Sequence, residues 1–261
     1  MRSLVVACAL ALLPVGAWAA DEPEPIAPDR AGAATGASTV GRGAVQLEAG
    51  LAYERERIAG SPPARRLTVE AALRAGVTER LELRVDGEPL VRLRGAEDDT
   101  SHGDFGLGAK YRFLDGTDGS WIPSLGVLPF VKLPVAEPPI GSGKTDFGAL
   151  LLASFALPGQ VSLDVDAGMA AVGQSRPSGY LLQAIVAAGV SRDLVDWLTL
   201  FSDVIYASRD ERAGRDSVVL DAGVVWRPRR DVAVDASVVT SLAGPGPDWA
   251  LRAGVSLRFG R

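Results

Sequence analysis

The sequence predicts an all-β protein: a transmembrane, antiparallel, up-and-down β-barrel of about twelve strands. Three observations support this fold class. Apolar and polar residues alternate through most of the chain, most of the expected strands are long, and short connections alternate with longer ones. Outer-membrane barrels combine these features, because a tilted strand needs about ten residues to cross a bilayer and the periplasmic turns are short.

The strand around which the prediction is organised covers residues 104–113, and the strand with the cleanest alternation covers residues 249–259. In the strand 104–113, one face would carry Phe105, Leu107, Ala109, Tyr111 and Phe113. The other face would carry Asp104, Gly106, Gly108, Lys110 and Arg112. Successive side chains of a strand point to opposite faces, so this strand has one apolar and one polar face. The pattern fits a soluble sheet over a core as well as a barrel with lipid outside and a wet lumen.

Similar alternation predicts the other strands. In chain order, the expected strands lie at 45–54, 67–76, 80–86, 104–113, 121–133, 147–155, 161–168, 180–190, 197–206, 218–227, 232–238 and 249–259. Most are longer than the roughly five or six residues that are usual in globular proteins. The chain shows no useful stretch of helical periodicity.

The connections between these strands differ in length. The short ones are 78–79, 115–120, 158–159, 191–196 and 228–230. The alternate ones are mostly longer: 57–65, 87–103, 134–144, 173–179, 208–215 and the shorter 242–246. Outer-membrane barrels show this asymmetry, and an even number of strands would place both chain ends on the periplasmic side.

The N-terminal part divides into two segments before the barrel. Residues 1–19 have a basic start, an apolar run and the small-residue site Ala17-Trp18-Ala19, which predicts a cleavable signal peptide for export to the outer membrane. Residues 20–42 are rich in Pro, Ala, Gly and Thr without periodicity, which predicts a flexible N-terminal arm. The alternative for this arm is a segment tucked into the lumen. The barrel would cover residues 43–261.

Composition excludes several classes of function. A net charge of −5 and a pI of about 5.1 offer no basic surface for nucleic acid. The single cysteine, Cys8, lies in the expected signal peptide, so the exported chain would have no disulfide and no thiolate metal site. We expect no cofactor and no bound metal.

The polar faces carry the candidate functional residues, with both charge signs interleaved. The lumen-facing residues that would line a substrate path are Glu48, Glu70, Arg74, Glu82, Arg84, Asp86, Lys110, Arg112, Asp164, Asp166, Asp221, Asp235, Arg252 and Arg258. Rings of charge would select the solute. Salt bridges that only stiffen the barrel, or the solvated face of a soluble sheet, are the alternatives.

Five glycines share the inward register of the charged residues: Gly106, Gly108, Gly168, Gly223 and Gly254. They would leave room for a solute or relieve the curvature of the barrel. A twelve-stranded barrel lies between barrels of about eight strands, which their own side chains fill, and those of about sixteen, which hold a channel. We therefore expect a narrow or partly plugged passage.

Aromatic residues lie near the expected strand ends, where membrane interfaces favour them. These residues are Tyr53, Phe113, Trp121, Trp226, Trp249 and Phe259. Outer-membrane proteins commonly end on a strand whose final residue is aromatic. This chain is similar, although two residues follow Phe259.

The run from Ser101 to Leu114, SHGDFGLGAKYRFL, resembles the signature of a family of Gram-negative outer-membrane proteins. Members are often called transporters and are named for the MetA pathway of phenol degradation. Residues 43–50, 73–84 and 129–146 are similar as well, so the resemblance covers most of the expected exported chain. It implies a porin-like barrel that passes small organic or aromatic compounds, with no catalytic residues to carry over.

An enzyme is not expected. His102 is the only histidine, and its neighbours Ser101 and Asp104 are too close in sequence to present the geometry of a hydrolytic triad. Residues 141–145 are similar to a phosphate loop, but Pro138 stands at the position of its first glycine and no helix follows. The acidic run 97–99 could bind a divalent cation, or bridge to lipopolysaccharide through one, but a solvated loop is the simpler interpretation.

We therefore predict an outer-membrane channel or transporter through which small organic solutes, including aromatic ones, diffuse. Its partners would be outer-membrane lipid, lipopolysaccharide and the small-molecule solute. Two alternatives stay open: a structural or adhesive barrel without an open pore, and a secreted soluble β protein that binds a hydrophobic ligand.

Overall fold

The computed structural model describes residues 25–30, 32, 34–57, 60–96 and 98–260, and the predicted signal peptide lies outside this part of the chain. Thirteen strands of the described residues form one sheet. They are β1 (Val45–Glu56), β2 (Ala64–Gly76), β3 (Leu81–Arg94), β4 (Asp99–Ser101), β5 (Phe105–Leu114), β6 (Ser124–Leu133), β7 (Asp146–Leu157), β8 (Val161–Ser175), β9 (Ser178–Val195), β10 (Leu198–Ala207), β11 (Ser217–Arg229), β12 (Val232–Ala243) and β13 (Trp249–Phe259). None of these residues belongs to a helix long and apolar enough to span a membrane.

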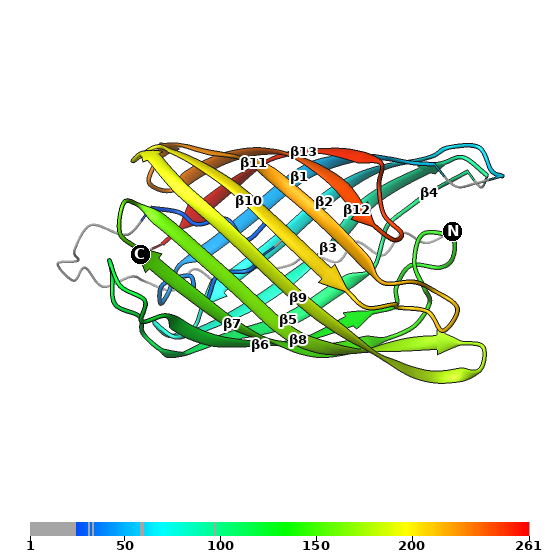
Figure 1. Cartoon of the computed structure of the whole chain (residues 1–261), viewed down its shortest axis with the longest axis horizontal. Coiled ribbons are helices and arrows are strands. Elements are labelled where there is room, and N and C mark those ends of the chain that lie inside the picture. Colours follow the sequence, from blue (N-terminus) through cyan, green and yellow to red (C-terminus); the bar gives the residue numbers. More distant parts are fainter. Residues whose placement is uncertain (1–24, 31, 33, 58–59, 97, 261) are drawn as a thin grey trace, which may run out of the picture.

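The sheet closes on itself. β1 pairs with β13, from Val45 opposite Phe259 to Arg55 opposite Trp249, and each other long strand pairs antiparallel with the next long strand. The short β4 pairs with the far end of β3. Apart from β4, the strands of the described chain thus form the closed antiparallel barrel of twelve strands that the alternation predicts (Figure 1).

The two ends of the barrel differ. The turn end holds the connections 77–80, 115–123, 158–160, 196–197 and 230–231, with the start of β1 and the end of β13. The loop end holds the connections 57–63, 95–104, 134–145, 176–177, 208–216 and 244–248. Both ends of the barrel sequence therefore lie at the turn end, as expected for an even number of long strands.

Several of the sequence-based boundaries are wrong, among them the expected connection 191–196, most of which belongs to β9 because that strand continues to Val195. The expected loop 173–179 is mostly strand, because β8 and β9 pair as far as Ser175 opposite Ser178 and leave a turn of Arg176 and Pro177. β3 extends to Arg94 inside the expected loop 87–103, and β6 begins only at Ser124. Cross-strand pairing outweighs the Gly, Ser and Pro composition from which the loop 173–179 was predicted.

Apolar side chains cover the outer face of the strands. On β5, Leu107 and Tyr111 are 43% and 46% exposed, whereas Lys110 between them is fully buried. On β7, Leu151 is 61% exposed and the next residue, Leu152, only 1%. The apolar face is thus turned outward and the polar face inward, which contradicts a soluble sheet with its apolar face on a core and is typical of a lipid-facing barrel.

Aromatic pairs mark both rims of this apolar face. At the loop end, the ring centroids of Tyr53 and Trp249 lie 5.7 Å apart, and those of Phe147 and Tyr180 lie 5.2 Å apart. At the turn end, Trp121 meets Phe155 at 6.1 Å. Aromatic girdles of this kind occupy the two membrane interfaces of outer-membrane barrels.

The described residues from 25 to 44, here called the lumenal arm, pack inside the barrel before β1 begins. Ile26 is fully buried against Val225 and Ala233 at the turn end. Ala37 is fully buried too. Its partners are Leu128 of β6 and Leu152 of β7. The arm thus takes the place inside the lumen that the sequence left as an alternative, while its flexibility and the boundary at residue 20 stay predictions.

Candidate functional site

The structure places the charged residues predicted to face the lumen on the inward side of the strands. The buried ones are Glu48, Arg74, Glu82, Lys110, Asp166, Asp221 and Asp235. The half-buried ones are Glu70, Arg84, Asp86, Arg112, Asp164, Arg252 and Arg258. Their burial comes from one another and from the lumenal arm, so many of them hold the arm. A role for these residues in a solute path remains a prediction.

The arm enters and leaves the lumen through the turn end. Near its start, the backbone N–H of Ile26 donates to the carbonyl of Arg230 at 2.8 Å, in the β11–β12 turn. Near its end, the N–H of Gly43 donates to the carbonyl of Gly76 at 2.9 Å. Between these two anchors the arm rises into the lumen and returns.

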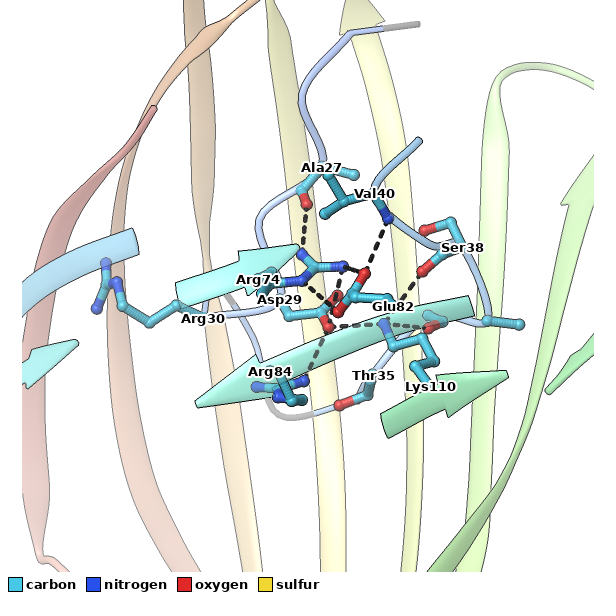
Figure 2. A network of polar contacts seen from close by, with 12 residues as sticks. Ala27, Asp29, Arg30, Thr35, Ser38, Val40, Arg74, Glu82, Arg84 and Lys110 are labelled. Atoms are coloured by element: carbon cyan, nitrogen blue, oxygen red, sulfur yellow. Dashed lines mark hydrogen bonds and ion pairs between the residues drawn. The ribbon is translucent and has the colours of Figure 1, made fainter. Parts of the chain in front are cut away.

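Asp29 of the arm meets three cations from neighbouring strands (Figure 2). Its Oδ2 lies 2.6 Å from Nζ of Lys110, 3.0 Å from Nη1 of Arg84 and 3.4 Å from Nη2 of Arg74. Burial alone would raise the pKa of the Asp29 carboxyl. The positive charges of Arg74, Lys110 and Arg84 outweigh that effect and hold its pKa well below the ordinary value of 3.8.

The three cations on β2, β3 and β5 are here called the basic wall, and they have further partners. Arg74 donates to Glu82 through Nε at 2.7 Å and to Glu48 through Nη1 at 3.0 Å. Lys110 donates to the arm carbonyls of Gly36 and Ser38 at 2.9 and 3.1 Å. A charge network closed in this way offsets the cost of burying its members.

Arg30 points away from Asp29 (Figure 2). Its Nη1 donates to Glu70 at 3.1 Å and its Nη2 pairs with Asp235 of β12. The far side of the barrel, from β8 to β12, carries carboxylates and is here called the acidic wall. Its members are Asp164, Asp166, Asp203, Asp221 and Asp235. Two consecutive arm residues of opposite charge therefore reach walls of opposite charge.

Carboxylates of the barrel also accept hydrogen bonds from the backbone of the arm. Glu48 accepts from the N–H groups of Asp29 and Arg30 at 3.2 and 2.8 Å. Asp166 accepts from Thr35 at 2.7 Å, and Glu82 accepts from Val40 at 2.8 Å. These bonds satisfy the polar backbone of a segment that has no sheet partner of its own.

The arm separates two cavities of the lumen. The cavity towards the loop end has a volume of about 600 Å³, and Phe105, Phe130, Arg84 and Lys132 are among the residues that line it. The cavity towards the turn end has a volume of about 450 Å³ and is lined in part by Asp118, Asp164, Asp193 and Arg227. Asp29 lines both cavities and therefore marks the constriction between them.

The loop 134–145 folds back over the first cavity. Ile140 lines that cavity and packs with Ala136 against Val91 of β3. The N–H of Ala136 donates to Asp104 at 3.0 Å, and Nζ of Lys132 lies 2.6 Å from Asp146. The loop therefore covers part of the loop-end cavity, while the width of the passage stays a prediction.

Sequence reasoning missed Asp29 and Arg30, because the arm has no periodicity that could assign its side chains to a face. It also missed Asp203, which lies on a strand with weak alternation and is 6% exposed. Arg112 and Arg258 lie on the inward side near the turn-end rim, where Arg112 lines the turn-end cavity and pairs with Asp115 at 3.0 Å.

The inward glycines fall into two groups. A Cβ on Gly168 or Gly223 would meet the backbone carbonyl of the adjacent strand, so these glycines allow close approach of strands. A Cβ on Gly106 would lie 2.6 Å from a carboxylate oxygen of Asp86, and one on Gly254 would meet the Arg30 guanidinium. Gly106 thus leaves room for a side chain in the lumen, and so does Gly108, whose Cβ would lie 3.0 Å from Cγ of Arg84. Gly254 belongs to both groups, because its Cβ would also lie 2.5 Å from the carbonyl oxygen of Ala49 on the adjacent strand.

Among solved structures, the barrel is similar to outer-membrane channels. It matches the COG4313 outer membrane channel from Pseudomonas putida F1 with a TM-score of 0.65 and 12% identity, covering 85% of this chain and 97% of that one. A NanC porin matches with a TM-score of 0.55 and 11% identity over 82% and 98% of the two chains. A KdgM porin matches with a TM-score of 0.51 and 8% identity, covering 82% of this chain and 99% of that one.

Sequence comparison agrees with this fold. None of the curated protein sequences compared with the chain is a match. The family model described as "Putative MetA-pathway of phenol degradation" matches residues 28–259, which include the lumenal arm from Pro28 onward and nearly all of the barrel. The chain therefore belongs to this family and is a porin-like β-barrel of the outer-membrane type.

Proposed function

We propose that the protein is an outer-membrane channel for small organic solutes, and that the lumenal arm closes it at mid-height. The observation that carries this proposal is the pair of cavities on the two sides of Asp29. Their volumes of about 600 and 450 Å³ are in the range of pockets that hold small molecules. The exposed apolar outer face supports a location in the outer membrane, with lipid and lipopolysaccharide as its surroundings.

The lining of the loop-end cavity supports the class of solute. Phe105, Phe130 and Leu128 offer apolar contacts, and Arg84, Lys132 and other charged groups lie beside them. A small organic molecule with a hydrocarbon or aromatic part and one polar group fits such a lining. Passage to the turn end then requires the arm to move away from the constriction.

Single-channel conductance in planar bilayers tests this proposal. The chain that begins at residue 20 is expected to show small or rare currents, whereas a variant that also lacks residues 25–40 is expected to conduct steadily. Heat-modifiable migration on a gel controls for an intact barrel. A deletion variant that inserts as a folded barrel but carries no current would contradict the channel and favour a structural barrel.

A further inference from the structure

The surroundings of Arg30 have the form of a binding site. Four inward residues lie directly opposite one another across adjacent strands: Asp235 of β12, Gly254 of β13, Gly50 of β1 and Glu70 of β2. The row thus has a carboxylate at each end and two glycines between them. The Arg30 side chain, only 7% exposed, lies on this row.

The two glycines make room for the guanidinium. A Cβ on Gly50 would lie 2.5 Å from both Cζ and Nη1 of Arg30, and a Cβ on Gly254 would overlap Cζ and Nη2. A residue with a side chain at either position would therefore fill the place of the planar group. Glycine pairs of this kind allow a ligand to approach the backbone closely.

The two carboxylates match the fork of a guanidinium. Nη1 of Arg30 donates to Glu70 at 3.1 Å, while Nη2 pairs with Oδ1 of Asp235, whose side chain is 3% exposed. The other oxygen, Oδ2 of Asp235, is buried and makes no hydrogen bond with any described residue. Such charge-assisted hydrogen bonds are roughly twice as strong as neutral ones, and a row of this shape selects a flat cation.

The row also borders free space. Arg30, Glu70 and Arg252 line the loop-end cavity, so the site opens towards the mouth through which an external solute would enter. Arg252 is the nearby cation, and its Nη2 lies 3.9 Å from Glu70, too far for a hydrogen bond. Without Arg30, the two carboxylates would keep only this loosely placed counter-ion.

We propose that the row Asp235–Gly254–Gly50–Glu70 is a binding site for guanidinium groups. Arg30 occupies the site as a tethered ligand when the arm is docked. A solute with a guanidinium group occupies it when Arg30 is absent. That such cations pass through the channel as solutes rests on the proposed function. The binding itself does not depend on conduction.

Titration calorimetry with detergent-solubilised protein tests binding without any measurement of current. The probe is ethylguanidinium chloride, and ethylurea serves as the uncharged analogue of similar shape. The Arg30→Ala variant is expected to bind ethylguanidinium at least about tenfold more tightly than the wild-type chain does. Ethylurea is expected to bind neither protein.

Two further variants in the Arg30→Ala background locate the site. Exchange of Glu70→Gln together with Asp235→Asn is expected to abolish binding, whereas Asp210→Asn, in the exposed loop 208–216 and outside both cavities, is expected to leave it unchanged. Gly254→Ala is expected to weaken binding because its Cβ would fill part of the space that the guanidinium occupies. Heat-modifiable migration verifies that each barrel is folded.

The proposal is wrong if Arg30→Ala binds ethylguanidinium no better than the wild-type chain, if ethylurea binds equally, or if the double carboxylate variant still binds. Conduction by the arm-deleted variant together with no binding would reject this site alone. Binding together with no conduction would reject the channel and leave the guanidinium site standing.

Discussion

Asp29 and Arg30 are neighbours in the chain, but the walls that hold them differ. Asp29 is one anion among three cations, and the basic wall is closed by further bonds from Arg74 to Glu48 and Glu82. Arg30 is one cation between two carboxylates, on a glycine floor beside a cavity. Removal of Asp29 breaks a network, whereas removal of Arg30 vacates a pocket. The comparison teaches that the first residue holds the arm and the second fills a site.

The largest effect is expected from Asp29→Ala, because it leaves Lys110 and Arg74 buried with fewer counter-charges. Loss of one partner of a buried ion pair costs about 3–5 kcal/mol, which would release the arm from the lumen. Release can be measured with Ala37→Cys, a thiol probe at a fully buried arm position, since the chain after residue 20 has no other cysteine. Maleimide should label this probe much faster in the Asp29→Ala background. Unchanged labelling would show that the basic wall does not hold the arm.

A control separates this effect from a general change of charge. Asp210→Asn removes an exposed carboxylate of the loop 208–216. Its side chain is remote from the arm, so the thiol probe should be labelled at the same rate as in the otherwise wild-type chain.

Arg30→Ala changes the residue next to Asp29 in the chain. Its effect on labelling should be smaller than that of Asp29→Ala, because Asp29 keeps all three cations.

Acid should have the next largest effect. The pKa of Asp29 lies below its ordinary value of 3.8 when the arm is docked, so the ionised form favours docking. Its contribution is complete above the ordinary pKa and is lost as the pH falls from about 4 through the lower docked pKa. The part of the thiol labelling that is due to Asp29, corrected for the reactivity of a free thiol at each pH, should therefore be constant from pH 7 to 5 and rise below about pH 4. The part due to Asp29 is the part that disappears in Asp29→Ala, and a rise between pH 7 and 5 would assign the control of docking to other groups.

Lys110→Met tests a single cation of the basic wall. The variant keeps a similar side-chain length but loses the bonds to Asp29, Gly36 and Ser38. Arg74 and Arg84 still face Asp29, so the loss should be limited to about 1.5–3 kcal/mol, the range for hydrogen bonds with a charged partner. Labelling of the thiol probe should accelerate less than in Asp29→Ala. An equal or larger acceleration would make Lys110 the main anchor.

The smallest effect is expected at the rim. Thr39 donates one hydrogen bond to the carbonyl of Glu79 at 2.9 Å, in an exposed position. Its loss in Thr39→Ala should weaken docking by at most about 0.5–1.5 kcal/mol, the net value of an ordinary hydrogen bond. Conductance traces and labelling should hardly differ from the wild type. A large effect would mean that the arm is held at the turn end and not at mid-lumen.

The barrel could be predicted from sequence because the signal that encodes it is local. Alternation with a period of two assigns each side chain to a face without knowledge of its partners, and residues 104–113 show it over a whole strand. The long strands and the asymmetric connections then distinguish a membrane barrel from a soluble sheet. The hairpin at Arg176 and Pro177 was mispredicted since pairing with a neighbour, absent from local composition, extends both strands.

The candidate site could be predicted only in part, because its main features depend on distant segments. The inward charges were found, but their partners in the arm were not, since nothing in residues 25–44 has a period. The row of Asp235, Gly254, Gly50 and Glu70 joins residues from four strands, and it becomes visible only once the register of each pair is known. Gly254 was named as a glycine that either leaves room or relieves curvature. In the structure, a Cβ on Gly254 would meet the Arg30 guanidinium and would also lie 2.5 Å from the carbonyl oxygen of Ala49 on β1, so this glycine makes room for a lumenal side chain and for the adjacent strand.

The path of the arm has a consequence for how the molecule is assembled. The arm enters and leaves the lumen at the turn end, where it is anchored to Arg230 and Gly76. It is therefore a loop inserted from one end and not a segment threaded through the barrel. Such a loop can enter the lumen after the barrel has closed, and leave it again, without breaking any strand pairing. No chain end has to be threaded through the barrel. The barrel can therefore close before or after the lumenal arm docks inside it.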